Sequence, residues 1–160
     1  MHIAIDRTNK HLDLHAIIRA ATVPNEDGDA QVSATIEFPS GDFYFDERAT
    51  YRGSSTCSLR LIGAGSYATR LHYAGDSHWA IRFLGANRSS IEGMEIINEA
   101  AMPIDQMIWF DATNTYVEKM NPRRPINGCF MRDVALVVMP ERMTHHGGVL
   151  RLGREALPTP

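Results

Sequence analysis

The first hydrophobic stripe in the chain has the spacing of a helix. Leu14, Ile17, Ile18 and Ala21 follow one another at intervals of three, one and three residues, which places them on one helical face. Asp13 stands where a helix-capping side chain is expected, and Pro24 disfavours helical geometry at the preceding Val23. The pattern predicts one helix over about residues 12–22.

From Val32 onward the hydrophobic period changes to two, which is typical of β-strands. Val32, Ala34, Ile36 and Phe38 alternate with polar residues before a Pro-Ser-Gly turn at 39–41. Short alternating segments then recur to the end of the chain, and no second helical pattern interrupts them. The chain is therefore expected to be all-β after the helix.

Several of these segments resemble one another. Leu59-Arg60-Leu61 matches Ile81-Arg82-Phe83 at a shift of 22 residues, Ile108-Trp109-Phe110 at a further 27, and Leu150-Arg151-Leu152 at a further 42. A second series, residues 91–96 against residues 131–136, is shifted by 40. Repeats of this kind indicate stacked coils, so we expect a right-handed parallel β-helix of about four to five coils over residues 31–160. A long loop is expected at about 112–128, residues 1–30 would form the N-terminal segment with the capping helix, and a β-sandwich is the alternative fold.

Residues 34–45, 59–65 and 69–71 together resemble the opening of the pectate-lyase-like right-handed β-helix superfamily, which includes phage tailspikes. The shared features are a capping helix, a strand entering a proline–small–glycine turn, an aromatic residue, and Gly63-Ala64-Gly65 before Thr69-Arg70-Leu71. The resemblance implies a parallel β-helix that binds, and in some members cleaves, polysaccharide. It implies nothing specific about catalytic residues.

Composition and charge narrow the choice of partners. A content of 44% apolar residues excludes a disordered chain. A net charge of −3 excludes that the chain as a whole binds nucleic acid or anionic lipid as a polycation. The sequence indicates no membrane span and no signal peptide, so we expect a cytoplasmic protein as synthesised, either virion-associated or exported without a classical leader. Cys57 and Cys129 are expected to be buried thiols, and no metal or cofactor motif is present.

The repeat predicts a ligand-binding wall. Residues between two inward positions point outward, so four side chains should form one column: Arg60, Arg82, Trp109 and Arg151. Arg123 and Arg124 in the long loop would overhang it. A tryptophan beside arginines suits an acidic polysaccharide, because an indole stacks on a sugar ring and guanidinium groups bind carboxylate or sulfate. The alternative is that these side chains bind no ligand and only make this face of the protein soluble.

Catalysis by this wall would need further groups. A glycoside hydrolase uses two carboxyl groups, for which Asp111 and Asp133 are the candidates, with Asp105 and Glu118 as other partners for Asp111. A polysaccharide lyase would instead use an arginine and a base. The sequence leaves open which reaction, if any, takes place.

The expected C-terminal end of the solenoid has no capping element. Residues 153–160 contain two prolines and a single leucine, Leu157, which cannot cover a core. We therefore expect this end to meet a protein partner or another copy of the chain, for example in a homotrimer. The alternative function is accordingly a non-catalytic stem, cap or assembly module of a larger particle.

Overall fold

The computed structural model describes residues 1–54, 56–111, 128–138 and 143–152 of the chain. Within these residues it contains one helix, α1 (Leu14–Thr22), and eleven strands. The strands are β1 (His2–Ala4), β2 (Ala34–Glu37), β3 (Gly41–Phe45), β4 (Ala49–Arg52), β5 (Leu59–Ile62), β6 (Thr69–Tyr73), β7 (Trp79–Leu84), β8 (Ser90–Asn98), β9 (Ile104–Asp111), β10 (Phe130–Val137) and β11 (Met143–Leu152).

The predicted helix is confirmed, and its two ends form as the sequence indicated. The Asp13 side chain accepts a hydrogen bond from the backbone N–H of Ala16 at 2.8 Å, which satisfies one free donor of the first turn. Val23 closes the helix in the left-handed region, with φ 45°, and its N–H donates to the Arg19 carbonyl. Leu14, Ile18 and Ala21 are buried on the inner face.

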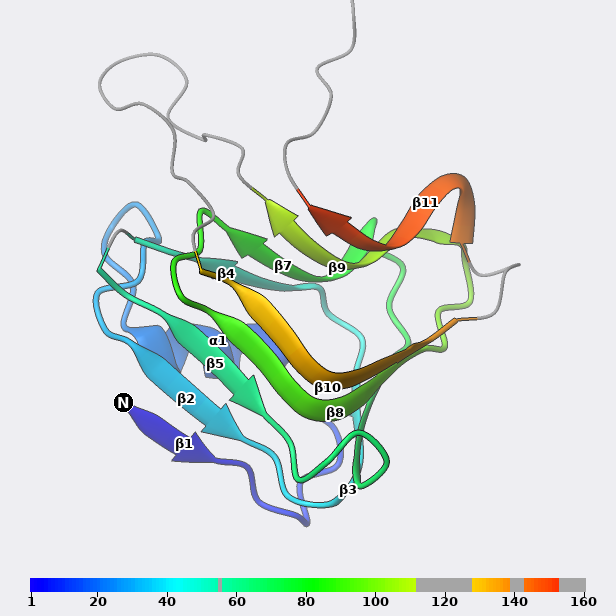
Figure 1. Cartoon of the computed structure of the whole chain (residues 1–160), viewed down its shortest axis with the longest axis horizontal. Coiled ribbons are helices and arrows are strands. Elements are labelled where there is room, and N and C mark those ends of the chain that lie inside the picture. Colours follow the sequence, from blue (N-terminus) through cyan, green and yellow to red (C-terminus); the bar gives the residue numbers. More distant parts are fainter. Residues whose placement is uncertain (55, 112–127, 139–142, 153–160) are drawn as a thin grey trace, which may run out of the picture.

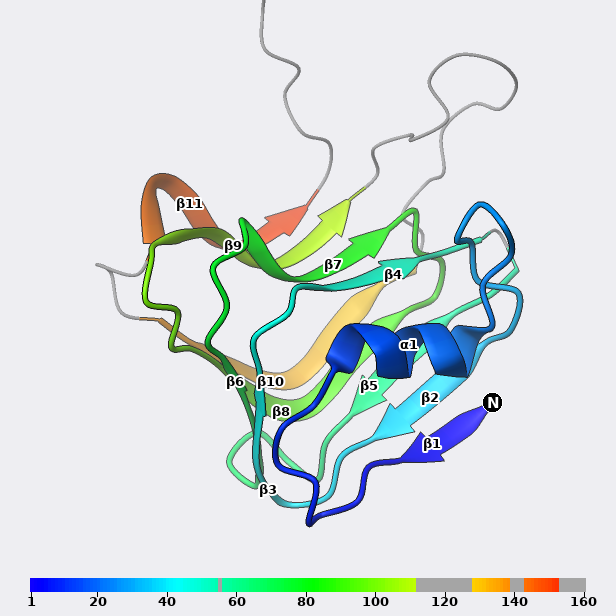
Figure 2. The ribbon, with the colours of Figure 1, turned by 180° about the vertical axis from the view of Figure 1, so that it is seen from behind.

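The strands form two parallel sheets that curl toward each other (Figure 1). The seven-stranded sheet has the order β1-β2-β5-β8-β6-β3, with β10 also paired to β8. The four-stranded sheet has the order β11-β9-β7-β4. Seen from behind, α1 packs against both β2 and β4 and so closes one end of the space between the sheets (Figure 2).

The predicted β-helix of four to five regular coils is wrong. β8 pairs with β5 through Ser90–Glu92 and then with β6 through Glu95–Asn98, so both partners belong to one continuous sheet. The prediction from the repeat assumed that each matching strand occupies the same position in the next coil of a solenoid. The described strands instead make two curled sheets of unequal size, without a regular solenoid.

The individual shifts explain the error. The pairings of Ile81 with Ile108, of Ile108 with Leu150, and of Ile91 with Met131 confirm the shifts of 27, 42 and 40 residues. The shift of 22 is wrong, because β5 lies in the seven-stranded sheet and β7 in the four-stranded one. Both strands carry the same alternation, and alternation does not say to which sheet a strand belongs.

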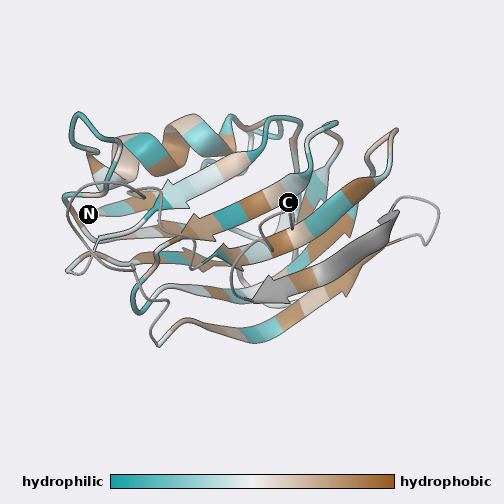
Figure 3. Ribbon diagram, turned by 90° about the horizontal axis from the view of Figure 1, so that it is seen from above, coloured by the Kyte–Doolittle hydropathy of each residue, from teal (hydrophilic) through white to brown (hydrophobic). Residues whose placement is uncertain are grey.

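The core lies between the two sheets and under α1. Hydrophobic and hydrophilic positions alternate along many strands (Figure 3), and the inward positions are buried. Equivalent inward residues of neighbouring strands touch, as Phe83 and Phe110 do with ring centroids 4.8 Å apart. Cys57 is buried as predicted, whereas Cys129, also predicted to be buried, is only partly so.

Candidate functional site

The predicted wall is only partly assembled. Arg82 pairs with Trp109 across β7 and β9, and Trp109 with Arg151 across β9 and β11, so these three share the four-stranded sheet. Arg60 is on β5 in the other sheet and does not belong to this column. Arg123 and Arg124 lie outside the described residues, and so does Glu118.

Arg82 is enclosed by its neighbours. Its guanidinium carbon lies 4.3 Å from the ring centroid of Trp109 and 4.8 Å from that of Trp79, and its Nε donates to Asp111 Oδ2 at 2.8 Å. Trp109 is 2% exposed and Asp111 is fully buried. A sugar ring cannot stack on the face of an indole that is this deeply buried. Arg82, Asp111 and Trp109 therefore form a packed ion pair and not an open binding surface.

Sequence reasoning missed Trp79. This half-buried indole also lies 5.0 Å from the Arg48 guanidinium carbon, and its Nε1 is 3.4 Å from Thr50 Oγ1. It stands two residues before Ile81, where the inward pattern of β7 was recognised. A tryptophan at the start of a strand that carries an outward arginine is the signal that would have found it.

The two predicted catalytic carboxylates are not brought together. Asp111 ends β9 in the four-stranded sheet, whereas Asp133 is on β10 in the seven-stranded one. Asp133 is exposed, has φ 52°, and accepts a hydrogen bond from the Ser66 N–H at 3.2 Å. Asp105, the other described partner considered for Asp111, is 2.7 Å from His78 Nδ1 instead.

The outer face of the seven-stranded sheet carries Arg60, Arg132 and Glu92, and Asp133 on β10 contacts the turn that carries Tyr67; we call these five residues the arginine face. Arg60 donates to Glu92 Oε1 through Nη2 at 2.8 Å, and Arg132 Nη2 donates to Oε2 of the same carboxylate. The Glu92 side chain is 4% exposed, whereas those of Arg60 and Arg132 are 44% and 73% exposed. One buried carboxylate therefore holds two exposed guanidinium groups.

Glu92 is ionised in this cluster. Burial would raise the pKa of its carboxyl, but the hydrogen bonds from Arg60 and Ser90 and the charges of Arg60 and Arg132 outweigh it and hold the pKa below its ordinary value. The Ser90 hydroxyl lies 2.7 Å from Glu92 Oε1. Glu92 and Arg132 are 40 residues apart, which is the shift of the second repeat series, and they pair across β8 and β10.

An aromatic ring and a second carboxylate stand at the edge of the arginine face. Asp133 follows Arg132 directly in the chain, and its contact with Ser66 ties it to the turn that carries Tyr67. Tyr67 is 87% exposed, which is unusual for a side chain of its size. Two guanidinium groups and two carboxylates thus lie on one sheet, and an open aromatic ring stands on the turn that contacts Asp133.

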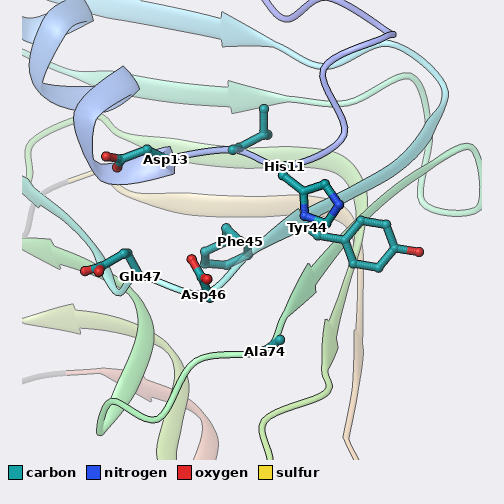
Figure 4. A pocket seen from close by; sticks show the side chains of 8 residues that line it. His11, Asp13, Tyr44, Phe45, Asp46, Glu47 and Ala74 are labelled. Carbon is teal, nitrogen blue, oxygen red and sulfur yellow. The ribbon is translucent and has the colours of Figure 1, made fainter.

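A pocket of about 530 Å³ opens elsewhere, beside the start of α1 (Figure 4). Figure 4 shows Asp13 and Glu47 on one side and the rings of His11 and Tyr44 on the other, with Asp46 between them. The His11 and Tyr44 rings are stacked at 5.5 Å, and the second face of Tyr44 stacks on His72 at 4.6 Å. The pocket is acidic, unlike the arginine face.

Two negative findings concern the described part of the chain. No group of three or more His, Cys, Asp or Glu side chains there could hold a metal ion. No helix there has the length and apolar character needed to cross a bilayer.

Comparison with protein-family models, curated proteins and solved structures finds no match for this chain. The resemblance to the pectate-lyase-like superfamily therefore remains a prediction from the sequence.

Proposed function

We propose that this protein binds an acidic polysaccharide through the arginine face. The observation that carries the proposal is the sharing of Glu92 by Arg60 and Arg132. The two guanidinium groups exceed the charge of Glu92 by one, and the exposed Asp133 at the edge of the face balances this excess; Arg60 binds Glu92 through Nε and Nη2, and Arg132 through Nη2. Carboxylate or sulfate groups accept paired hydrogen bonds from such donors.

The neighbouring groups suit the rest of a sugar unit. The exposed Tyr67 ring offers an apolar face to the C–H groups of a pyranose, and the Asp133 carboxylate accepts hydrogen bonds from hydroxyl groups. Buried Glu92 holds both arginines in place before a ligand arrives, which reduces the entropy lost on binding. Arg60 and Asp133 were predicted as site residues, but in a different arrangement.

Binding of polygalacturonate and of neutral dextran, measured by titration calorimetry at low salt, tests this function. We expect Arg132→Ala to weaken polygalacturonate binding about ten- to one-hundred-fold, since one charge-assisted interaction contributes about 1.5–3 kcal/mol. Tyr67→Ala should weaken it several-fold, and dextran should not bind. Arg132 is the better target because Arg60 is more enclosed, with 44% of its side chain exposed.

Arg70→Ala is the matched control. Arg70 is on the same sheet and has 45% of its side chain exposed, but it is paired with its own carboxylate, Asp42. Binding should change less than two-fold in this variant. Absence of binding to polygalacturonate and to sulfated heparin, or an equal loss in Arg70→Ala, would overturn the proposal.

A second candidate function, assembly with further copies of the chain, is favoured by the outermost strands. Phe130 and Val137 on β10 and Leu150 on β11 are 46%, 37% and 42% exposed. Among the described residues β10 pairs only with β8, and β11 only with β9. Light scattering would test it: we expect an oligomer that Phe130→Ser dissociates, whereas a monomer at all concentrations contradicts it.

A further inference from the structure

The surface beside the arginine face carries an exposed phenylalanine. β10 lies alongside β8 (Figure 1), with Phe130 opposite Ser90 and Arg132 opposite Glu92. Side chains two residues apart on a strand point to the same side, so Phe130 and Arg132 share the outer face of the sheet. Met131, between them, packs against the core on the other side. An aromatic ring that is 46% exposed therefore stands about 7 Å along the strand from Arg132.

The backbone under this ring is tied to the neighbouring segment. The Phe130 N–H donates to the Ser89 carbonyl at 3.1 Å, and the Cys129 thiol donates to the Ala86 carbonyl at 3.6 Å. The ring is thus presented by an ordered part of the chain. A ligand that stacks on Phe130 does not have to order this segment first, which lowers the entropic cost of binding.

A third guanidinium group lies beyond the ring. Arg88 is exposed and stands two residues before β8. Gly128 lies against it, since a Cβ on Gly128 would be 3.5 Å from the Arg88 Cγ. Gly128 is four residues before Arg132, and four extended residues span at most about 14 Å. The end of this surface at Arg88 is therefore separated from the arginine pair by Phe130.

Arg88 also changes the charge of the surface. Arg60, Arg132 and Arg88 are three guanidinium groups, whereas Glu92 and Asp133 are two carboxylates. The excess positive charge lies at the Phe130 end. A single uronic acid has one carboxylate and cannot occupy both positive regions, whereas a polymer with an acid group on every unit can.

We propose that the arginine face recognises a chain of several acidic sugar units laid along β10, with Phe130 as a second stacking platform and Arg88 binding an anionic group beyond it. This inference rests on the polysaccharide binding proposed above. Tyr67 is linked to the Asp133 side of Arg132 and Phe130 lies on the other side, so the two rings flank the arginine pair. Groups joined in one ligand bind more tightly than the same groups separately, and the site therefore discriminates a polymer from a single sugar.

The dependence of affinity on chain length tests the proposal. Titration calorimetry of the full chain at low salt gives the affinity for hexagalacturonate, and displacement of that ligand gives the affinity for galacturonic acid. The wild-type protein should bind hexagalacturonate at least about ten-fold more tightly than the single sugar. Phe130→Ala and Arg88→Gln should each weaken hexagalacturonate binding about three- to ten-fold and change galacturonic acid binding less than about two-fold.

Two control variants separate stacking from a general effect of the strand. Phe130→Tyr keeps the ring and should bind hexagalacturonate within about two-fold of the wild type. Val137→Ala removes an apolar side chain that is 37% exposed at the other end of β10, and it should also leave the affinity within about two-fold. A loss in Val137→Ala equal to that in Phe130→Ala would overturn the proposal.

The failure of this inference differs from the failure of the proposed function. If Arg132→Ala weakens binding of both ligands while Phe130→Ala and Arg88→Gln weaken neither, the inference is wrong and the proposed function stands. If the wild-type protein does not bind hexagalacturonate, both are wrong. If light scattering shows that Phe130→Ala dissociates an oligomer while the preference for the longer ligand is unchanged, Phe130 serves assembly and the inference is again wrong.

Discussion

Arg82 and Asp111 form an ion pair between β7 and β9, with the carboxylate fully buried and the guanidinium group held against two indole rings. Two charges removed from water in this way are costly unless each satisfies the other. The pair therefore makes the four-stranded sheet sensitive to the loss of either partner.

Arg82→Met should destabilise the protein strongly. The substitution keeps most of the packing against Trp109 but removes the guanidinium group that pairs with the buried Asp111 carboxylate, and breaking a buried pair costs about 3–5 kcal/mol. Urea unfolding followed by tryptophan fluorescence measures the loss. Arg70→Met, in a pair whose side chains are 45% and 35% exposed, should cost less than about 1 kcal/mol, and equal losses would refute the distinction.

Stability should fall at acid pH. The pKa values of Asp42 and Glu92 are lowered in the folded protein from their ordinary values of 3.8 and 4.5. A carboxyl with a depressed folded pKa contributes stability that is present above the unfolded value and is lost as the pH falls toward the folded one. The urea concentration at the unfolding midpoint should therefore decrease when the pH is lowered below about 4.5.

Glu92→Gln is the variant that isolates one of these groups. It should cost about 2–3 kcal/mol at pH 6, because it weakens the charge-assisted hydrogen bonds from Arg60 and Arg132, and progressively less as the pH approaches 3. A cost independent of pH would show that Glu92 does not contribute through its charge.

Two tyrosines should resist ionisation. Burial is the largest cause that raises the pKa of Tyr51 and of Tyr73, both of which are fully buried. The folded protein favours the neutral form of each phenol. Its stability is therefore retained at pH values below the ordinary tyrosine pKa of 10.0 and is lost as the pH rises above that value. Absorbance at about 295 nm should show these two rings ionising only together with unfolding.

Gly63→Ala should disrupt the turn after β5. A Cβ at this position would overlap the Gly93 carbonyl oxygen and lie 2.9 Å from the Thr69 Cβ. We expect a loss of about 2–3 kcal/mol, since the backbone of β8 must shift to make room. Ala64→Ser, one residue further along the same turn and exposed, should change stability by less than about 0.5 kcal/mol.

Local features of the fold were predictable because they depend on neighbours in sequence. The face of α1, the Asp13 cap and the end at Val23 follow from residues within one or two helical turns. The registers of β8 with β10 and of β7 with β9 were also recoverable, because stacked inward residues favour similar side chains. The assignment of β5 and β7 to one column was wrong. The alternation of hydrophobic and polar residues shows which side chains of a strand point inward, but not which sheet the strand joins.

The candidate site was less predictable for the same reason. Arg60 and Arg82 look alike in sequence, yet Arg60 shares Glu92 with Arg132, whereas Arg82 pairs with the buried Asp111. Which carboxylate an outward arginine meets depends on the strand beside it, 29 or 32 residues away in these two cases. The exposure of Tyr67 and the burial of Trp109 likewise depend on distant segments.

The pairing of β8 has a consequence for how the chain can fold. Nine residues set the alignment of three other strands at once, because β5 and β6 are placed end to end along one edge of β8 and β10 lies along the other. A slip of β8 by one residue would misplace all three partners together and turn its core side chains toward solvent. The correct register of this one strand is therefore a condition for the correct register of its three neighbours.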